Sequence, residues 1–226
     1  MATALSDMLL EGNATMSAEE DLLGATAMFT PAGSYTLWID QVGAFVVCLA
    51  DMVAIGGPST GVNAADVPLL ANLSRRHITF LRSGERYVLH AHAATSVGGR
   101  PVNEKCDLAD GAELQLGASV RLRFRIPSVV SGSARLEFLS DHRPASAADG
   151  VVLMSDTCLM GPSAENHIRC PAWPSSLLLF RRDGNLRVKG REDLFLDGRH
   201  SPEGGILVEG TIVSATDLRF RVERFA

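Results

Sequence analysis

The stretch Val120-Arg121-Leu122-Arg123-Phe124-Arg125-Ile126 decides the fold class of this chain. Four apolar side chains alternate with three arginines. Because successive side chains of a β-strand point to opposite faces, this stretch turns an apolar face to a core and an arginine face to solvent. The two-residue period predicts a half-buried strand.

Further segments have the composition of strands. They are rich in β-branched and aromatic residues and are bounded by Gly, Asp, Asn or Pro. These segments are residues 36–40, 45–55, 78–82 and 87–92. Since no long helical pattern lies between them, we predict an antiparallel β-sandwich. We expect Trp38, Trp173 and the run Leu177–Phe180 in the core.

The sequence contains an internal repeat. Residues 46–56 align without a gap with residues 151–161, and a Val-Val pair, an Asp and a Gly coincide. Residues 122–126 likewise match residues 218–222 at a shorter offset, so the second copy has lost a few residues inside. Such similarity indicates duplication of a unit that folds by itself.

The repeat predicts a domain division. We expect an all-β chain of two tandem antiparallel β-sandwiches, residues 34–130 and 131–226, packed against each other, with residues 142–148 as a loop inside the second. Residues 1–33 have little periodic pattern, and we expect a flexible N-terminal arm there. Within the arm, Ser17–Leu23 has capping-box form and allows one short helix.

The composition of the chain excludes some classes of function. The chain has 226 residues, 46% hydrophobic and 21% charged, with a formal net charge of -5. These values are typical of a soluble globular protein and argue against binding to nucleic acid. Without a signal-like start or a long apolar run, we expect a cytoplasmic protein that binds no membrane. Four cysteines without CxxC or CxxH spacing predict reduced thiols, with neither metal nor cofactor.

Five landmarks follow one another in a fixed order. They are Ile55-Gly56, Ala65-Asp66-Val67, Leu73-Ser74-Arg75-Arg76-His77, Val97–Asn103 and Leu108–Gly117. This ordered set resembles the forkhead-associated (FHA) domain over residues 35–126. FHA domains are β-sandwiches that hold a phosphothreonine peptide across loops at one end, so the resemblance implies a protein or phosphothreonine peptide as partner.

The resemblance assigns roles to individual residues. Ser74 matches the serine whose hydroxyl bonds phosphate, and Arg75 follows as a charge-assisted donor. Gly56 and His77 match structural positions, the histidine bracing the loop. Together with the family's non-enzymatic chemistry, these matches imply no catalytic residue.

Part of the family pattern is missing. Gly57 stands where the family has an arginine that contacts phosphate, and Gly98-Gly99-Arg100 reads where the family has an Asn-Gly-Thr turn. Losing one charged hydrogen bond costs about 1.5–3 kcal/mol. Arg100 compensates if its side chain turns into the same pocket, and Asn103 is a further candidate peptide contact.

The second copy departs further. Gly161-Pro162 again lacks the arginine, and Pro171–Leu178 contains no histidine at the matching place. Leu196-Asp197-Gly198 keeps only a turn. We therefore expect a degenerate FHA-like sandwich that serves packing or protein contact.

These observations favour a non-catalytic protein-interaction module that reads phosphothreonine peptides through a degraded site. The alternative is a scaffold or adaptor that works regardless of phosphorylation, in which the polar loop only satisfies its own backbone. A serine hydrolase using Ser59, within Gly57–Gly61, is less favoured because no helical pattern follows the serine. His90 and His92 share one strand face, but no third ligand follows at metal-site spacing.

Overall fold

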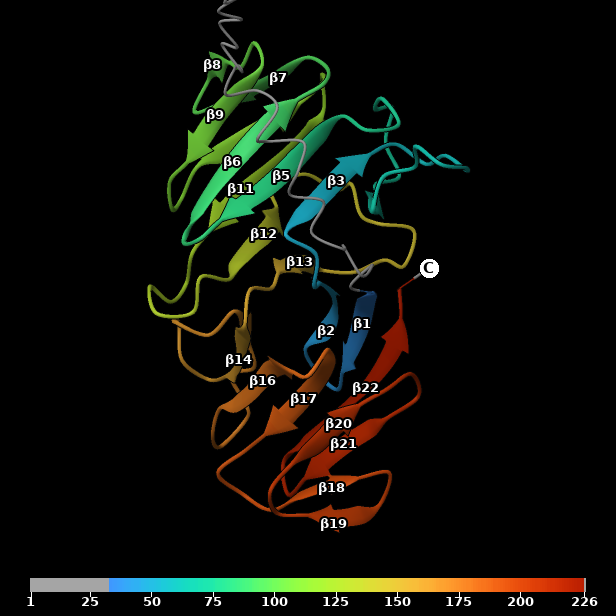
Figure 1. The fold of residues 1–226 in the computed structure, drawn as a ribbon, viewed down its shortest axis with the longest axis vertical. Coiled ribbons are helices and arrows are strands. Elements are labelled where there is room, and N and C mark those ends of the chain that lie inside the picture. Colours follow the sequence, from blue (N-terminus) through green and yellow to red (C-terminus); the bar gives the residue numbers. More distant parts are fainter. Residues whose placement is uncertain (1–32, 226) are drawn as a thin grey trace, which may run out of the picture. The chain divides into compact units, whose positions relative to one another are not determined.

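The structure is a computed structural model, and it describes residues 33–225. Every regular element in this range is a β-strand, so the predicted all-β class is confirmed (Figure 1). These residues form no helix, and so they contain no helix that is long and apolar enough to span a bilayer. The predicted N-terminal arm and its short helix lie outside the described residues.

Eleven strands come from each half of the chain. The first half contributes β1 (Ser34–Ile39), β2 (Gly43–Cys48), β3 (Met52–Gly56), β4 (Val67–Pro68), β5 (Ile78–Ser83), β6 (Arg86–Ala91), β7 (Thr95–Val97), β8 (Arg100–Pro101), β9 (Lys105–Leu108), β10 (Glu113–Leu116) and β11 (Val120–Arg125). The second half contributes β12 (Ala134–Phe138), β13 (Gly150–Leu153), β14 (Thr157–Gly161), β15 (Ile168–Arg169), β16 (Leu177–Arg182), β17 (Asn185–Lys189), β18 (Leu194–Leu196), β19 (Arg199–Ser201), β20 (Gly205–Leu207), β21 (Ile212–Ala215) and β22 (Leu218–Arg224).

The longest sheet has a palindromic strand order. Its twelve strands run β19-β18-β21-β22-β1-β2-β13-β12-β11-β10-β7-β8, so each strand of one half has its counterpart at the mirrored position. At the centre, β2 and β13 pair in parallel, with Val46 opposite Val151 and Val47 opposite Val152. The repeated Val-Val pairs of the sequence therefore lie side by side. Two five-stranded sheets, β4-β3-β5-β6-β9 and β15-β14-β16-β17-β20, correspond in the same way.

The first hairpin of each half, β1–β2 or β12–β13, pairs with the last strand of the other half within the twelve-stranded sheet. β1 pairs with β22, placing Leu37 opposite Val222, and β12 pairs with β11, placing Leu136 opposite Phe124. Each sandwich thus combines one half's strands with the other half's hairpin. The domain division near residue 130 stays a prediction.

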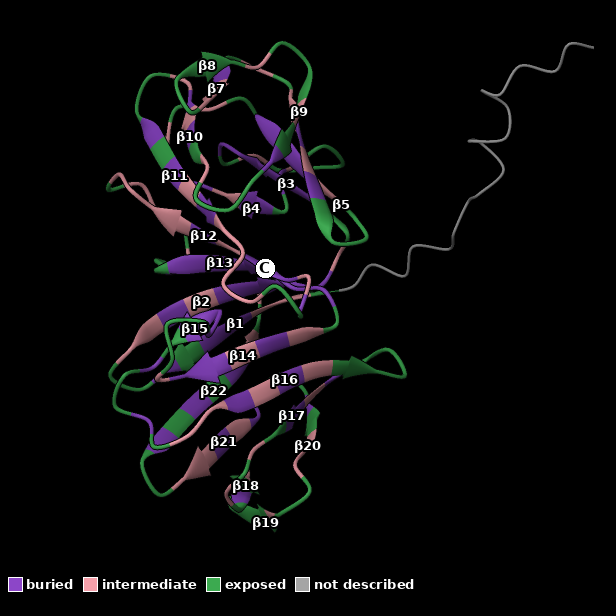
Figure 2. Cartoon of the chain, turned by 90° about the vertical axis from the view of Figure 1, so that its left-hand side faces the viewer, coloured by how far each residue is buried: buried purple, intermediate pink, exposed green. Residues whose placement is uncertain are grey.

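Two hydrophobic cores confirm this arrangement of side chains. Val46 and Val151 lie in the core shared with β5, β6 and β11, whereas Val47 and Val152 lie in the core shared with β16, β17 and β22. The central strands are therefore buried on both faces, as the purple colouring of β13 shows (Figure 2). A strand buried on both faces requires a continuous apolar run, which is what the repeat preserves.

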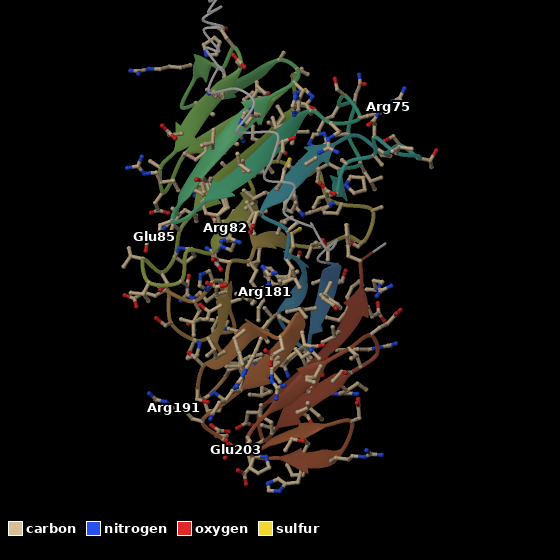
Figure 3. All side chains as sticks on the ribbon, in the orientation of Figure 1. Arg75, Arg82, Glu85, Arg181, Arg191 and Glu203 are labelled. Carbon is tan, nitrogen blue, oxygen red and sulfur yellow. The ribbon has the colours of Figure 1, made fainter. Side chains whose placement is uncertain are left out.

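The prediction of one strand over residues 45–55 is wrong. Residues 49–51 separate β2 from β3, because here the chain leaves the twelve-stranded sheet for a five-stranded one. Arg82 pairs with Asp51 and also donates to Ser155 Oγ of the other half at 2.8 Å. At the matching position of β16, Arg181 donates to the Leu49 carbonyl at 2.9 Å (Figure 3). An arginine of each half therefore contacts the segment through which the other half passes from the twelve-stranded sheet to a five-stranded one.

The two tryptophans differ in environment. Trp173 is buried and stacks on Phe220 with ring centroids 6.4 Å apart, as predicted. Within the run Leu177–Phe180, alternate residues are buried. The prediction for Trp38 is wrong, since this side chain is 40% exposed and its indole N–H donates to Glu223 Oε2 at 2.7 Å. It lies on the open face of β1, where its N–H needs a polar partner.

Candidate functional site

The loop from Leu73 to His77 lies between β4 and β5 and is held by hydrogen bonds to its backbone and to the His77 side chain. The Gly57 N–H donates to the Ser74 carbonyl at 2.9 Å, and the Ser74 N–H donates to His77 Nδ1 at 3.3 Å. Because Nδ1 accepts this bond, Nε2 carries the proton and donates to the Ala94 carbonyl at 3.0 Å. His77 is buried, so it braces the loop from inside.

Two glycines let the loop lie directly against the end of β3. A Cβ on Gly56 would lie 1.9 Å from the Arg75 carbonyl oxygen, and one on Gly57 would lie 2.5 Å from the Leu73 carbonyl oxygen. Neither position has room for a side chain. The place where the FHA family carries an arginine is filled here by the loop backbone.

The tip of the loop presents a hydroxyl beside two cations. Ser74 and Arg75 are exposed, and Arg76 is partly exposed. Figure 3 shows Arg75 on the loop outside the sheets. Among residues 33–225, no carboxylate forms an ion pair with Arg75 or Arg76. Uncompensated guanidinium groups next to a hydroxyl suit a phosphate.

Residues 92–94 adjoin this loop, which the sequence did not indicate. The His92 N–H donates to the His77 carbonyl at 2.9 Å, and its Nε2 lies 2.8 Å from Thr79 Oγ1. Burial lowers the pKa of His92, and Arg76, His90 and His77 lower it further. The ring is therefore mostly neutral at pH 7. No group of three possible metal ligands occurs in the described part of the chain, so His90 and His92 remain without a third.

Arg100 and Asn103 belong to the segment that runs from β8 to β9. Gly98 and Gly99, with φ of 56° and 76°, form the tight turn between β7 and β8, and Arg100 starts β8. Arg100 and Asn103 line a separate hollow of about 560 Å³. No hydrogen bond or ion pair of the described chain joins either residue to the Ser74 loop. Hydrogen bonds join residues 92–94 to His77, whereas the roles of Arg100 and Asn103 in the site stay predictions.

The region around Ser59 is not a nucleophile elbow. That motif requires a helix directly after the serine, but the described residues 57–66 are turns and extended chain. Ser59 Oγ is buried and has no hydrogen-bond partner, so no base activates it.

The second sandwich has a buried indole at the corresponding place. Trp173 precedes β16 by the same number of residues as Ser74 precedes β5. Its ring packs on Phe220 in the core, and no arginine follows it before the strand. This end therefore offers neither an exposed hydroxyl nor a cation in that loop.

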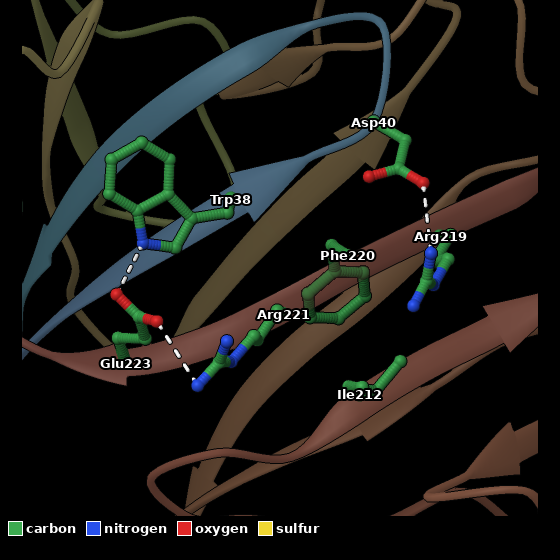
Figure 4. A pocket seen from close by; sticks show the side chains of 7 residues that line it. All are labelled: Trp38, Asp40, Ile212, Arg219, Phe220, Arg221 and Glu223. Atoms are coloured by element: carbon green, nitrogen blue, oxygen red, sulfur yellow. Dashed lines mark hydrogen bonds and ion pairs between the residues drawn. The ribbon is translucent and has the colours of Figure 1, made fainter.

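A hollow of about 420 Å³ beside Trp38 is electrostatically compensated (Figure 4). Glu223 accepts from Trp38 and pairs with Arg221 at 3.3 Å, and Asp40 pairs with Arg219 at 3.8 Å. Because both arginines face carboxylates, this hollow has no free charge for a phosphate.

Several solved structures that are similar to this chain are FHA domains. No family model and no curated protein matches the chain. Similar solved structures include the Rv0020c FHA domain, 29% identical, covering 37% of this chain and 84% of that one, with a TM-score of 0.28. The chain is similar to this FHA domain over part of its length. The FhaA FHA domain complexed with the intracellular domain of Rv3910 is 29% identical over 37% of this chain and 92% of that one, with a TM-score of 0.27.

A longer FHA-like match spans both halves. The N-terminal FHA domain of EssC, a component of the bacterial type VII secretion apparatus, covers 84% of this chain and 92% of that one at 14% identity. Its TM-score is 0.24. These matches agree with the resemblance seen in the sequence.

Proposed function

We propose that this protein is a non-catalytic interaction module that binds a phosphothreonine-containing protein or peptide at the Ser74–His77 loop. One observation carries the proposal. An exposed hydroxyl and two guanidinium groups, which pair with no carboxylate of residues 33–225, lie on a loop that His77 and the Gly57 N–H hold in place. A preorganised cluster of donors binds an anion without first ordering the loop.

The expected chemistry is that of a charge-assisted cradle. A phosphothreonine carries about −1.5 to −2 charges and three acceptor oxygens. The Ser74 hydroxyl donates one hydrogen bond, and the Arg75 guanidinium donates two in a fork. Because Gly57 supplies no arginine, the site has one charged donor fewer than the family pattern, which costs about 1.5–3 kcal/mol or one to two decades of affinity.

Phosphate-independent adaptor function is the second candidate. It is favoured by the loop end of the second sandwich, where Trp173 is buried in place of the hydroxyl. In either case we expect protein partners rather than nucleic acid or membrane, since the chain carries a net charge of -5. The cytoplasmic location stays a prediction.

Peptide titration separates the two candidates. The protein is titrated with a degenerate phosphothreonine library and its unphosphorylated twin, as wild type and as Ser74→Ala and Arg75→Ala. We expect binding of the phosphorylated library alone, weakened about tenfold or more by either substitution. Arg191→Ala, at an exposed arginine of the second sandwich, is the matched control and should bind as wild type. Equal binding of both libraries by all four proteins would establish the adaptor instead.

The hydrolase alternative has its own test. A serine-directed fluorophosphonate should leave Ser59 unlabelled, because no base contacts its buried hydroxyl. Labelling that Ser59→Ala abolishes would show that an activated serine is present.

A further inference from the structure

The hairpin exchange brings a loop of the second half to the site of the first sandwich. Residues 139–149 connect β12 to β13, and this hairpin lies in the first sandwich because β12 pairs with β11. Figure 1 shows the loop in yellow and gold, running from β12 toward the blue-green loops near β3. In the other sandwich, the corresponding connection between β1 and β2 consists only of residues 40–42. The long loop thus accompanies only the sandwich with Ser74 and Arg75.

Backbone contacts join this loop to the segment that leads into Ser74. The Leu70 N–H donates to the Arg143 carbonyl at 2.9 Å, and Leu69 and Pro144 form an isolated β-bridge. Leu69 and Pro144 are both buried. The two loops are therefore packed together.

A side-chain contact joins the same loop to the turn between β10 and β11. His142 Nε2 lies 3.3 Å from Ser119 Oγ, in the turn between β10 and β11. Gly117 of that turn lies against the loop from Leu73 to His77, since a Cβ there would lie 3.6 Å from Leu73 Cδ2 and 3.8 Å from His77 Cε1. His142 thus contacts a residue two positions from the glycine that lies against His77.

Arg143 orders the loop and leaves a positive charge at its surface. Its Nη1 donates to the carbonyls of Ser140 at 2.6 Å and His142 at 2.9 Å, and its guanidinium lies 5.0 Å from the Phe138 ring centroid. Carbonyl oxygens satisfy donors without neutralising the charge. No carboxylate of residues 33–225 forms an ion pair with Arg143, although Asp141 is exposed beside it.

We propose that this loop, contributed by the second half, forms one wall of the peptide site and selects acidic residues next to the phosphothreonine. The inference rests on the proposed function and deepens it. Arg75 and Arg76 lie on the Ser74–His77 loop, and Arg143 adds a guanidinium on the loop that packs against the segment leading into it. A carboxylate beside the phosphothreonine would pair with the Arg143 guanidinium. Peptide selection then requires both halves of the chain.

The test compares two substitutions that differ in charge. Arg143→Met and Arg143→Lys both lose the guanidinium fork, but only the second keeps a cation. The full chain is titrated with two phosphothreonine peptides, one with aspartates and one with serines flanking the phosphothreonine. Wild type and Arg143→Lys should prefer the acidic peptide, whereas Arg143→Met should lose about fivefold or more for that peptide alone. Amide resonances of residues 140–144 should shift during the wild-type titration.

The outcomes separate this inference from the proposed function. If Ser74→Ala abolishes binding while Arg143→Met leaves both affinities unchanged and residues 140–144 do not shift, the phosphopeptide function stands and the composite site is overturned. If the wild type binds neither peptide, both are overturned. Matching unfolding midpoints of Arg143→Met and Arg143→Lys ensure that the comparison reports charge.

Discussion

At the scale of single residues, close packing decides what the site can contain. The loop from Leu73 to His77 lies so close to Gly57 that the absence of a side chain at this position is a structural requirement. Overpacking of this kind costs about 1–3 kcal/mol, since the surrounding backbone must shift. The absent family arginine is therefore coupled to the way the loop lies on β3.

Gly57→Arg should consequently fail to improve binding. We expect the substitution to destabilise the protein by about 1–3 kcal/mol and to weaken phosphopeptide binding, because the new Cβ displaces Leu73 and with it Ser74. Urea unfolding and peptide titration measure the two effects. Pro58→Arg, one residue further at an exposed position, is the control. Tighter binding by Gly57→Arg at unchanged stability would show that the loop yields readily.

A buried histidine makes stability depend on pH. The Leu159 N–H donates to His167 Nδ1 at 3.0 Å, so Nε2 carries the proton and lies 2.7 Å from Ser131 Oγ. Burial, and secondly the charge of Arg135, lower the pKa of His167 to about 4. The unfolded chain binds this proton near pH 6.5. The contribution of His167 is therefore complete above pH 6.5 and is lost as the pH falls toward 4.

The loss should amount to about 3 kcal/mol at pH 4 and below. We expect wild type to lose this part of its free energy of unfolding between pH 7 and pH 4, and His167→Gln, which keeps a neutral hydrogen-bonding group, to be spared it. Urea titrations of both proteins across this range measure the difference in slope. Parallel curves would show that His167 does not titrate between the two states.

At the scale of elements, the crossovers connect the two halves. Arg82 is mostly buried and contacts both its own half, at Asp51, and the other half, at Ser155. The two arginines that hold the crossovers occupy matching positions in β5 and β16. They stabilise the bends at which each half of the chain leaves the twelve-stranded sheet.

Arg82→Met should destabilise the protein by about 1–3 kcal/mol, because it removes a charged donor from a nearly buried place and leaves Asp51 unpaired. Arg86→Met, on the neighbouring strand at an exposed arginine, should change stability by less than about 0.5 kcal/mol. Urea midpoints measured side by side decide the matter. Equal effects of both substitutions would assign no stabilising role to the crossover contact.

At the scale of the whole molecule, the exchanged hairpins make the two halves interdependent. The first core contains Ala134, Leu136, Val151 and Leu153 from the second half. The second core contains Leu37 and Ile39 from the first. Neither half holds all the apolar side chains of the sandwich to which it contributes most strands.

Fragments 33–130 and 131–226 should therefore complement each other. We expect each alone to unfold at a lower urea concentration than the full chain, and a mixture to recover a common, higher midpoint and to coelute in gel filtration. Independent unfolding of both fragments at the full-chain midpoint, without association, would mean that each hairpin returns to its own half at no cost.

Much of the architecture could be predicted from local pattern. The alternation in residues 120–126 specifies a strand with one apolar face, and the Val-Val repeat specifies two equivalent central strands. The loop from Leu73 to His77 was recognisable because its hydroxyl, cation and imidazole follow one another in the chain. Its neighbours were not, because residues 92–94 and 140–144 reach it only through folding.

The sequence alone thus determined the strand class, the repeat and the position of the polar loop, since these depend on periods and spacings within short segments. Tertiary structure decided which sheet each hairpin joins, why Trp38 is exposed, and which loops surround Ser74. The physical reason is that both first hairpins present the same kind of apolar face. An apolar face must be covered by another element. Which half of the chain covers it depends on strand pairing across the whole twelve-stranded sheet.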